Sequence, residues 1–323
     1  MAGSPGTREH AATVRILYVA GSGRSGSTLL GRMLGQTGGC TSVGELVRIW
    51  KRGAQRRVAC SCGEPFRRCP LWAAVGEAAF GGWDTLDARE LVALQRSVDR
   101  ARYVPFMLLP AAGRGYRQRL SRYTDVLRRL YTAVADVTGA DVVVDVSKRA
   151  STLFLLTRVP GVDLRVVHLV RDSRGVAYSW TKSVAKPEAT GPARYVGRFH
   201  PGVTAVRYLL DNLAVWLGAV IGVPTVFLRY EDLVAAPRDE LSRLLRFAGA
   251  RSDELEFLAR GAVQLAASHS VGGNPRRSEQ GQVLLDRDDE WRTRLPRRHR
   301  LLVTAVTLPL LGAYGYLTRR GER

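Results

Sequence analysis

Long hydrophobic runs are missing from this sequence of 323 residues. The N-terminus lacks the apolar core of a secretory signal, because Arg8, Glu9 and His10 interrupt it. The one membrane candidate, Leu301–Leu317, contains threonines, a proline and glycines, and it falls just below the length that spans a bilayer. We therefore expect a packed C-terminal helix there and a cytoplasmic protein.

Low-complexity tracts and internal repeats are also missing, so no disorder is expected beyond the first dozen or so residues. The chain is long enough for one large α/β domain with insertions or for two modest domains, and its 46% of hydrophobic residues supports a real core. We predict a disordered tail over residues 1–13 and a single domain over residues 14–323. A cysteine-containing and helical insertion is expected at about residues 51–138.

Lysine is scarce, since only four of the 49 basic residues are lysines. Arginine is thus the default cation, and a lysine at a chemically suggestive position stands out. The formal net charge of +20 favours anionic partners such as nucleotides, nucleic acid, anionic lipid or acidic sugars. Because the charge is spread along the chain, it favours a solvated arginine-rich surface over a nucleic-acid groove. We expect no nucleic acid as a partner and leave open peripheral attraction to an anionic membrane; the oligomeric state is not indicated.

Cysteine is scarce as well, and three of the four cysteines fall in the segment CSCGEPFRRC. This segment is compact enough for a small knuckle. However, Cys-x-Cys followed by a third cysteine after six residues is not a standard zinc spacing. Reduced buried thiols are favoured over a disulfide or a metal site, and we predict no metal ligand. The four cysteines of the sequence are Cys40, Cys60, Cys62 and Cys69.

A glycine-rich turn joins the first predicted strand, Arg15–Ala20, to a helix predicted over Gly26–Gln36. Such a turn is a cradle for phosphate, because glycines let the backbone approach the anion, amide N–H groups point at it, and the helix dipole adds positive charge. Residues 21–28 match the Walker A pattern G-x-x-x-x-G-K-[ST] except that Ser27 replaces the lysine. That lysine normally reaches the β- and γ-phosphates, so its absence argues against turnover of ATP or GTP. The competing interpretation is an ordinary βα turn.

The remaining chain alternates strands with helices. Continuous apolar runs at Asp141–Val146 and Leu164–Val170 predict buried parallel strands, and Tyr116–Thr138 has helical periodicity. We predict an α/β fold: a central parallel sheet flanked by helices, with a P-loop-like phosphate-binding loop and a helical insertion that either caps the site or is a structural layer. The other elements expected are strands at Cys40–Val43 and Thr225–Leu228, an irregular segment Lys51–Asp84, a loop Ser268–Gln282, and helices from Leu46, from about Asp84 to Arg102, at Ser151–Arg158, Ser173–Lys182, Thr204–Gly222, Ala236–Ala248 and Asp253–Ala267, and from about Arg297.

Ionisable residues follow four separate predicted strands. Arg24 and Glu45 follow the first two, and Lys148 and Arg171 follow the two long apolar runs. Because ligands bind beyond the carboxyl ends of strands in an open parallel sheet, we expect these side chains to share one edge and to form a site.

Two motifs together resemble one known family. GSGRSGSTLL (residues 21–30) resembles the 5′-phosphosulfate loop of the sulfotransferases that use 3′-phosphoadenosine 5′-phosphosulfate (PAPS), and LRVVHLVRDSRGVAYSW (residues 164–180) resembles their 3′-phosphate motif. The resemblance extends with decreasing sharpness through Asn274 and Trp291 to Tyr316. It implies transfer of a sulfuryl group and release of adenosine 3′,5′-bisphosphate.

The resemblance also implies roles for the strand-end residues. Glu45 is similar to the glutamate after the second strand of the protein-tyrosine sulfotransferases, and we predict it as the general base. Relatives of the cytosolic branch use a histidine two residues after the strand-end lysine, where this chain has Ala150. Lys148 is predicted to stabilise the leaving oxygen. Arg24 joins these two as a catalytic residue, and the predicted contacts to the 5′-phosphosulfate are Gly23, Arg24, Ser25, Gly26, Ser27 and Thr28.

The 3′-phosphate is assigned to Arg171 and Ser179, because arginine offers a planar fork to phosphate oxygens and a serine two helical turns on adds a hydroxyl. The alternative for Arg171 is an ion pair with Asp172 at the start of the helix. In the loop His269–Gly281, which matches the family only loosely, Arg276 is a further predicted phosphate contact and His269 is interpreted as structural.

The sequence therefore predicts a PAPS-dependent sulfotransferase that acts in line on a hydroxyl, or less readily an amine, of a carbohydrate, lipid or small-molecule acceptor, without a metal. Two alternatives stay open. Asp145, at the end of an apolar strand, resembles a Walker B carboxylate and would suggest a Mg²⁺-dependent kinase. The net charge is also compatible with a basic, non-enzymatic protein that binds polyanions.

Overall fold

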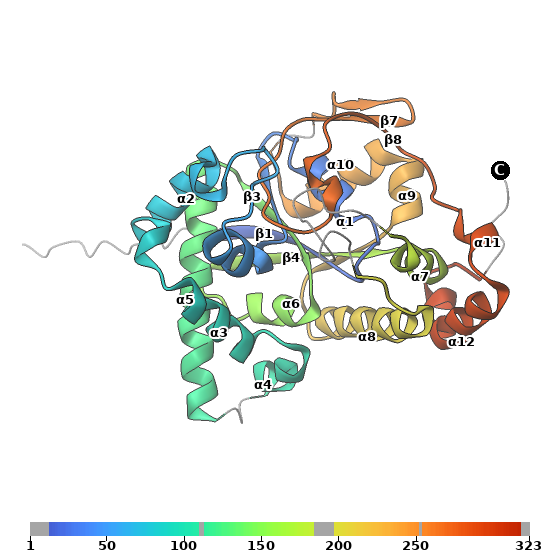
Figure 1. The fold of residues 1–323 in the computed structure, drawn as a ribbon, viewed down its shortest axis with the longest axis horizontal. Coiled ribbons are helices and arrows are strands. Elements are labelled where there is room, and N and C mark those ends of the chain that lie inside the picture. Colours follow the sequence, from blue (N-terminus) through green and yellow to red (C-terminus); the bar gives the residue numbers. More distant parts are fainter. Residues whose placement is uncertain (1–12, 110–112, 184–196, 252–253, 318–323) are drawn as a thin grey trace, which may run out of the picture.

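The structure is a computed structural model that describes residues 13–109, 113–183, 197–251 and 254–317. Its centre is a parallel sheet of five strands in the order β2-β3-β1-β4-β5 (Figure 1). This confirms the predicted fold class. Residues 1–12 of the predicted tail lie outside the described residues. The strands are β1 (Val14–Ala20), β2 (Cys40–Gly44), β3 (Val142–Lys148), β4 (Val162–Val170) and β5 (Thr225–Arg229).

Both faces of the sheet are buried, which is why its central strands read as continuous apolar runs. Along β1, Ile16 and Tyr18 point into one core, whereas Leu17 and Val19 point into the other. The first core is closed by α5 (Arg114–Thr138), α6 (Ala150–Leu156) and the helices of the insertion, and the second by α1 (Ser27–Leu34) and α10 (Pro237–Ala248). The other α-helices of the described residues are α2 (Pro70–Phe80), α3 (Ala88–Val98), α4 (Val104–Leu108), α7 (Ser173–Thr181), α8 (Pro201–Val220), α9 (Tyr230–Ala235), α11 (Trp291–Arg294) and α12 (Arg297–Ala313).

The segment after β2 differs from the sequence prediction. Instead of one helix from Leu46, a 3₁₀ turn at Leu46–Arg48 leads into a π-helix at Ile49–Gln55. Within the segment predicted to be irregular, α2 forms, with Pro70 at its first turn. The buried side of α2 contributes to an aromatic cluster whose other members come from outside the helix. Periodicity within one short helix does not reveal such a cluster. The cluster consists of Trp50, Phe66, Trp72, Phe80 and Trp83.

The helix predicted at Asp253–Ala267 is wrong. Its described part, from residue 254, contains instead two antiparallel strands, β6 (Leu258–Ala259) and β7 (Ala262–Leu265). A third strand, β8 (Gly281–Leu284), pairs with β7 to complete a small antiparallel sheet. Gly261 turns the chain between β6 and β7 with φ of 69°, a conformation that favours glycine. Pairing with a strand some twenty residues away therefore overrides the local helical pattern.

The predicted C-terminal helix is present as α12, which packs against α7 and α8 (Figure 1). It buries Val303, Leu310 and Leu311, and its Thr307 hydroxyl lies 2.7 Å from the Ser173 hydroxyl. By length and composition, α8 is the one described helix that could cross a membrane, with a mean hydropathy of 1.3 over a window of which 33% is buried. A core helix of a soluble protein meets the same criteria.

Candidate functional site

The glycine loop after β1 is tightly wrapped. A Cβ atom on Gly21 would lie 2.3 Å from the Leu169 carbonyl oxygen, and one on Gly26 would lie 2.4 Å from the Tyr230 ring. The φ angles of Gly21, Arg24 and Gly26 are 133°, 74° and 91°, so the loop curls back before α1 begins at Ser27. The loop therefore has room for glycine alone at two positions and presents the start of α1 at the carboxyl edge of the sheet.

Two buried polar atoms in this loop lack partners. Among the residues that the structure describes, neither the Ser25 hydroxyl nor Nε of Arg24 has a hydrogen-bond partner. The Arg24 guanidinium lies 5.3 Å from the centre of the Trp180 ring, and one of its terminal nitrogens donates a long 3.5 Å bond to the Ser179 carbonyl. Because unpaired buried polar groups are costly, both atoms fit a site that gains hydrogen bonds from an anionic ligand.

Arg171 follows β4 and turns toward the same loop. It donates to the Arg24 carbonyl at 3.4 Å and pairs with the Asp288 carboxylate at 3.0 Å, and its guanidinium lies 4.9 Å from the centre of the Tyr230 ring. The alternative ion pair with Asp172 is not formed, because Asp172 caps α7 and pairs with Arg174 instead.

Ser179 and Arg276 lie around this pair of arginines. Ser179 is half-buried and supplies the main-chain carbonyl that contacts Arg24. Arg276 is exposed, in a 3₁₀ turn at Pro275–Ser278. Burial lowers the pKa of Arg24, and the charges of Arg276 and Arg171 lower it further. The three guanidinium groups therefore repel one another, and a bound anion would relieve that repulsion.

Glu45 and Lys148 meet at the ends of β2 and β3. Nζ of Lys148 lies 2.8 Å from the Glu45 carboxylate and 3.0 Å from the Val146 carbonyl, and Arg48 pairs with the same carboxylate. Burial by itself raises the pKa of Glu45, but the Lys148 and Arg48 charges outweigh it and hold the pKa at about 2. Glu45 is therefore ionised at neutral pH. Lys148 has a φ of 69°, a strained angle for a side-chain-bearing residue of the kind found at functional sites.

A buried network fixes the chain just after Glu45. Tyr131 donates to the Asp145 carboxylate at 2.6 Å, the Ser147 hydroxyl donates to it at 2.5 Å, and the Val47 amide donates to the Ser147 hydroxyl at 3.0 Å. Asp145 is fully buried, and both of its oxygens are engaged by protein groups. This arrangement gives Asp145 a structural role and removes the Walker B-like argument for a kinase.

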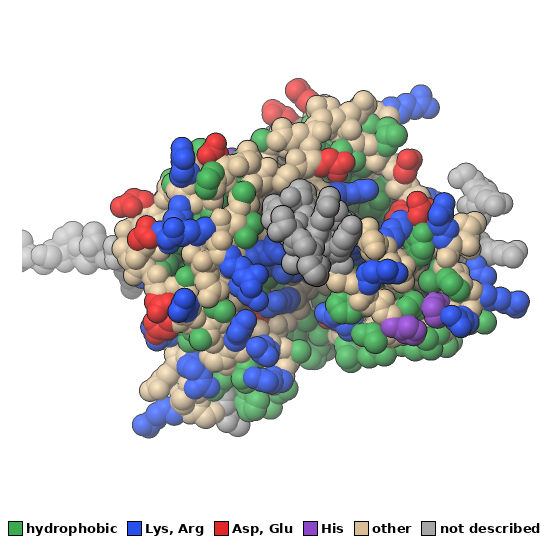
Figure 2. All heavy atoms as spheres, viewed as in Figure 1, with side chains coloured by type: hydrophobic (Ala, Val, Ile, Leu, Met, Phe, Trp, Pro, Cys, Tyr) green, Lys and Arg blue, Asp and Glu red, His purple; other side chains and the backbone are tan. Residues whose placement is uncertain are grey.

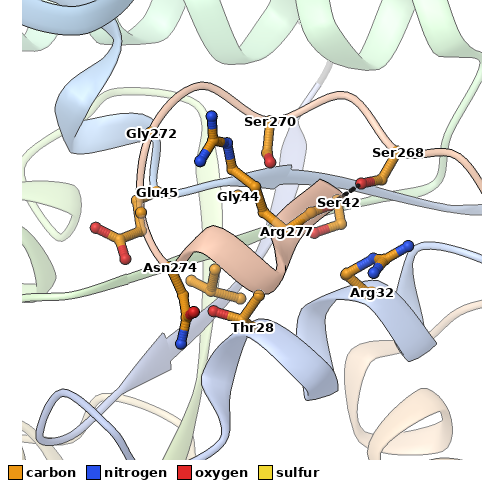
Figure 3. A pocket seen from close by; sticks show the side chains of 12 residues that line it. Thr28, Arg32, Ser42, Gly44, Glu45, Ser268, Ser270, Gly272, Asn274 and Arg277 are labelled. Carbon is orange, nitrogen blue, oxygen red and sulfur yellow. Dashed lines mark hydrogen bonds between the residues drawn. The ribbon is translucent and has the colours of Figure 1, made fainter. Parts of the chain in front are cut away.

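A small pocket lies between α1 and the C-terminal loop, and Glu45 is one of the residues that line it (Figure 3). A Cβ atom on Gly273 would lie 3.0 Å from a Glu45 carboxylate oxygen, and one on Gly44 would lie 2.4 Å from the Ser270 Cβ. The C-terminal loop therefore packs closely against the residues at the end of β2. The polar side chains in the lining are Thr28, Arg32, Ser42, Glu45, Ser268, Ser270, Asn274 and Arg277.

A larger pocket opens beside the residues that follow Glu45 and Lys148, and most of its lining comes from the segment 47–101. Among the described residues, the carboxylates in that lining are Asp99 and Asp211, and burial raises the pKa of Asp211 to about 6. Neighbouring arginines, Arg56 foremost, lower the pKa of Lys51. Figure 2 shows Lys and Arg side chains gathered near the centre of the face that it displays. The part of the chain that the structure describes contributes seven cations to the pocket lining: Arg48, Lys51, Arg52, Arg56, Arg96, Arg100 and Arg149.

The structure brings Arg24, Glu45, Lys148 and Arg171 to one edge, because all four follow or end neighbouring parallel strands. Sequence reasoning missed several of their contacts. Arg48, three residues after Glu45, could have been found from its spacing, and Trp180 ends a motif already singled out. Tyr230 and Asp288 could not have been found, since each is more than fifty residues from the arginine that it contacts.

A solved sulfotransferase domain shares this fold. The sulfotransferase domain of the olefin synthase from Synechococcus PCC 7002 has a TM-score of 0.50 at 18% identity, covering 95% of this chain and 98% of that one. The sulfotransferase domain from the curacin biosynthetic pathway gives 0.49 at 19% identity, covering 93% and 98%. Sulfotransferase STF9 from Mycobacterium avium gives 0.48 at 14% identity, covering 94% and 77%.

The family comparison rests on sequence. No curated protein matches the chain significantly. The family model described as the sulfotransferase family matches residues 17–254, which include the end of β1, the other four strands of the parallel sheet and the insertion. The chain therefore belongs to the sulfotransferase family and is a sulfotransferase enzyme.

Proposed function

We propose that this sulfotransferase takes its sulfuryl group from PAPS and transfers it to a hydroxyl of an acceptor that itself carries negative charge. The observation that carries the donor assignment is the group of three mutually repelling arginines beside a glycine loop with unpaired buried polar atoms. PAPS has anionic groups at both ends of its ribose, which matches a site with cations on both sides of the loop.

The residues present fit the two ends of such a nucleotide. The 5′ end would lie on the loop, with Arg24, the Ser25 hydroxyl and the amides of residues 25–28 as donors. The 3′-phosphate would lie on Arg171, with Ser179 and Arg276 as further donors. The role of Lys148 follows from its place at the end of β3, where its ammonium can face the oxygen that leaves with the nucleotide.

The transfer itself needs a proton acceptor and a stabilised leaving group. Glu45 accepts the proton of the acceptor hydroxyl, the hydroxyl oxygen forms a bond to sulfur, and the bond from sulfur to the bridging oxygen breaks. The electron pair of that bond stays with adenosine 3′,5′-bisphosphate, whose new charge Lys148 offsets. No metal takes part in these steps. The acceptor becomes a sulfate ester.

In this scheme Lys148 interacts first with Glu45 and then with the leaving oxygen of the nucleotide. It holds Glu45 in an ion pair at 2.8 Å, and a carboxylate with a pKa of about 2 is a weak base. When Lys148 turns to the leaving oxygen, its attraction for the Glu45 carboxylate weakens, and the pKa of Glu45 rises. Binding of the donor would thereby make Glu45 a better base at the moment it is needed.

The acceptor would enter through the larger pocket, in whose lining the structure describes seven cations and two carboxylates. A cleft lined mainly by one sign of charge concentrates ligands of the opposite sign. Such a pocket beside the proposed base favours a hydroxyl-bearing acceptor with a carboxylate, sulfate or phosphate group over a neutral one. An acidic carbohydrate or an anionic lipid headgroup has this chemistry.

Calorimetry tests the donor assignment. We expect adenosine 3′,5′-bisphosphate to bind at micromolar concentrations, and adenosine 5′-phosphate, which lacks the 3′-phosphate, to bind much more weakly. No binding at micromolar concentrations would overturn the proposal. Mg²⁺-dependent consumption of ATP would favour a kinase instead.

The acceptor class is tested separately with pairs of hydroxyl compounds that differ only in one anionic group. We expect sulfation of the charged member of each pair. Arg96→Gln should raise the KM for that compound several-fold with little change in kcat, since it removes binding that is uniform along the reaction. Arg128→Gln, an exposed arginine outside the pocket, is the matched control. Preference for the neutral compound would contradict the acceptor proposal and leave the donor proposal intact.

A further inference from the structure

Three cysteines and one histidine that the proposed chemistry does not use converge at one point. Cys60, Cys62, Cys69 and His269 place their ligand atoms within 4.8 Å of one another. The Cys69 sulfur lies 3.2 Å from Nδ1 of His269 and 3.8 Å from the Cys62 sulfur, and the Cys60 sulfur lies 3.9 Å from the same nitrogen. Three thiols and an imidazole are the donor set of a Cys₃His zinc site.

These separations fit one tetrahedral ion. With zinc–sulfur bonds of about 2.3 Å and zinc–nitrogen bonds of about 2.1 Å, neighbouring ligand atoms of a tetrahedron lie about 3.5–3.8 Å apart. The three separations given above, 3.2, 3.8 and 3.9 Å, bracket that range. By contrast, a disulfide requires sulfurs about 2.0 Å apart. The cysteines are free in this structure, and pairing two of them would leave the third thiol and the imidazole unexplained.

The backbone around the four side chains is built to hold them. The Cys60 amide donates to the Glu64 carbonyl and the Gly63 amide donates to the Cys60 carbonyl, which makes a tight turn around Cys62. Cys69 lies at the N-terminus of α2 and is fully buried, and Cys60 is 3% exposed. Positive helix-end charge beside Cys69 favours the thiolate form that binds a metal.

Hydrogen bonds also join the two parts of the chain that supply the ligands. Between Cys60 and Cys62, the Ser61 amide donates to the Ser270 carbonyl at 3.0 Å, and the Ser61 hydroxyl accepts from the Ser270 amide at 2.8 Å. The same hydroxyl donates to the Ser268 carbonyl at 2.5 Å. His269 is therefore held in place from both sides, facing the thiols.

We propose that Cys60, Cys62, Cys69 and His269 bind one Zn²⁺ ion, which fastens the insertion to the C-terminal loop. Four protein ligands leave no open position, so the ion is structural and takes no part in sulfuryl transfer. The loop that it anchors continues to Gly273, where an added Cβ atom would lie 3.0 Å from the Glu45 carboxylate, and to Arg276 near the nucleotide arginines. The cysteine spacing alone did not predict a metal, because the fourth ligand is 200 residues away from Cys69.

Metal content tests the proposal without any activity assay. The full chain, purified without chelator and analysed by mass spectrometry for metals, should carry about one Zn²⁺ per molecule. Cys62→Ser, at the half-exposed ligand that is least disruptive to the core, should lose most of it. Cys40→Ser is the matched control, because Cys40 is buried in the other core, away from the cluster, and should keep the metal.

Two further measurements keep the result interpretable if a variant folds poorly. Replacing zinc by Co²⁺ in the unmodified chain should produce the absorption of a tetrahedral thiolate complex. Removal of the metal with a chelator should increase trypsin cleavage at Arg276 and Arg277 several-fold, since the loop loses its anchor. A folded, unmodified chain that fails to bind added Zn²⁺ or Co²⁺, or one with a disulfide between two of these cysteines, would overturn the proposal.

Discussion

The two ends of the strand-edge site are in opposite electrostatic states. At the end assigned to the nucleotide, Arg24, Arg171 and Arg276 crowd together, and burial and mutual repulsion lower the pKa of Arg24. At the transfer end, the Glu45 carboxylate already has Lys148 and Arg48 as partners. The first end has one carboxylate, Asp288, beside its three guanidinium groups, whereas the second end already holds its carboxylate between two cations. Donor binding would therefore stabilise the first end and, by drawing Lys148 away, unbalance the second.

Glu45→Gln tests the transfer end and should have the largest effect. The amide cannot accept the acceptor proton, so we expect kcat to fall by about 10²–10⁴-fold, the usual range for a general base. Binding of adenosine 3′,5′-bisphosphate should survive and become somewhat tighter, because Lys148 no longer has to leave an ion pair with Glu45 to reach the nucleotide. Glu77→Gln, an exposed carboxylate on α2, is the control. Near-normal turnover in Glu45→Gln would assign the base to another group.

Arg171→Ala tests the nucleotide end. Loss of charge-assisted hydrogen bonds to a phosphate, worth about 1.5–3 kcal/mol, should weaken adenosine 3′,5′-bisphosphate by about 10–150-fold. Adenosine 5′-phosphate should be almost unaffected, and titration calorimetry compares the two. Equal weakening of both nucleotides would show that Arg171 does not contact the 3′-phosphate and would remove the distinction between the two ends.

A pH profile tests the coupling between the ends and should show the smallest effect. Glu45 must be ionised to accept a proton, so activity falls as the pH drops through its pKa. Burial raises that pKa, but Lys148 and Arg48 hold it at about 2 in the free protein. Once Lys148 faces the leaving oxygen the pKa rises, so the acid limb of kcat should lie at higher pH than that of kcat/KM. Coincident limbs would mean that the ends are independent.

The sheet and its strand-end residues could be predicted because their signals are local. An apolar run followed by glycines and hydroxyl residues marks β1 and the loop, and Glu45, Lys148 and Arg171 each stand at the end of a strand. Parallel strands then place their ends together without further information.

The rest depends on contacts between distant segments. The ribbon of β7 and β8 forms because Ala262–Leu265 pairs with Gly281–Leu284, which no local helical pattern reveals. In the insertion, α2 is held by an aromatic cluster that includes Trp50, well before the helix begins. The fourth member of the cysteine cluster, His269, comes from the C-terminal loop.

A crystal structure of the complex with adenosine 3′,5′-bisphosphate tests the central claim most directly. We expect the 5′-phosphate on the Ser25 hydroxyl and the loop amides, the 3′-phosphate on Arg171, and Lys148 moved away from Glu45 beyond its present 2.8 Å. A nucleotide bound elsewhere, or bound here with its 3′-phosphate away from Arg171, would contradict the account.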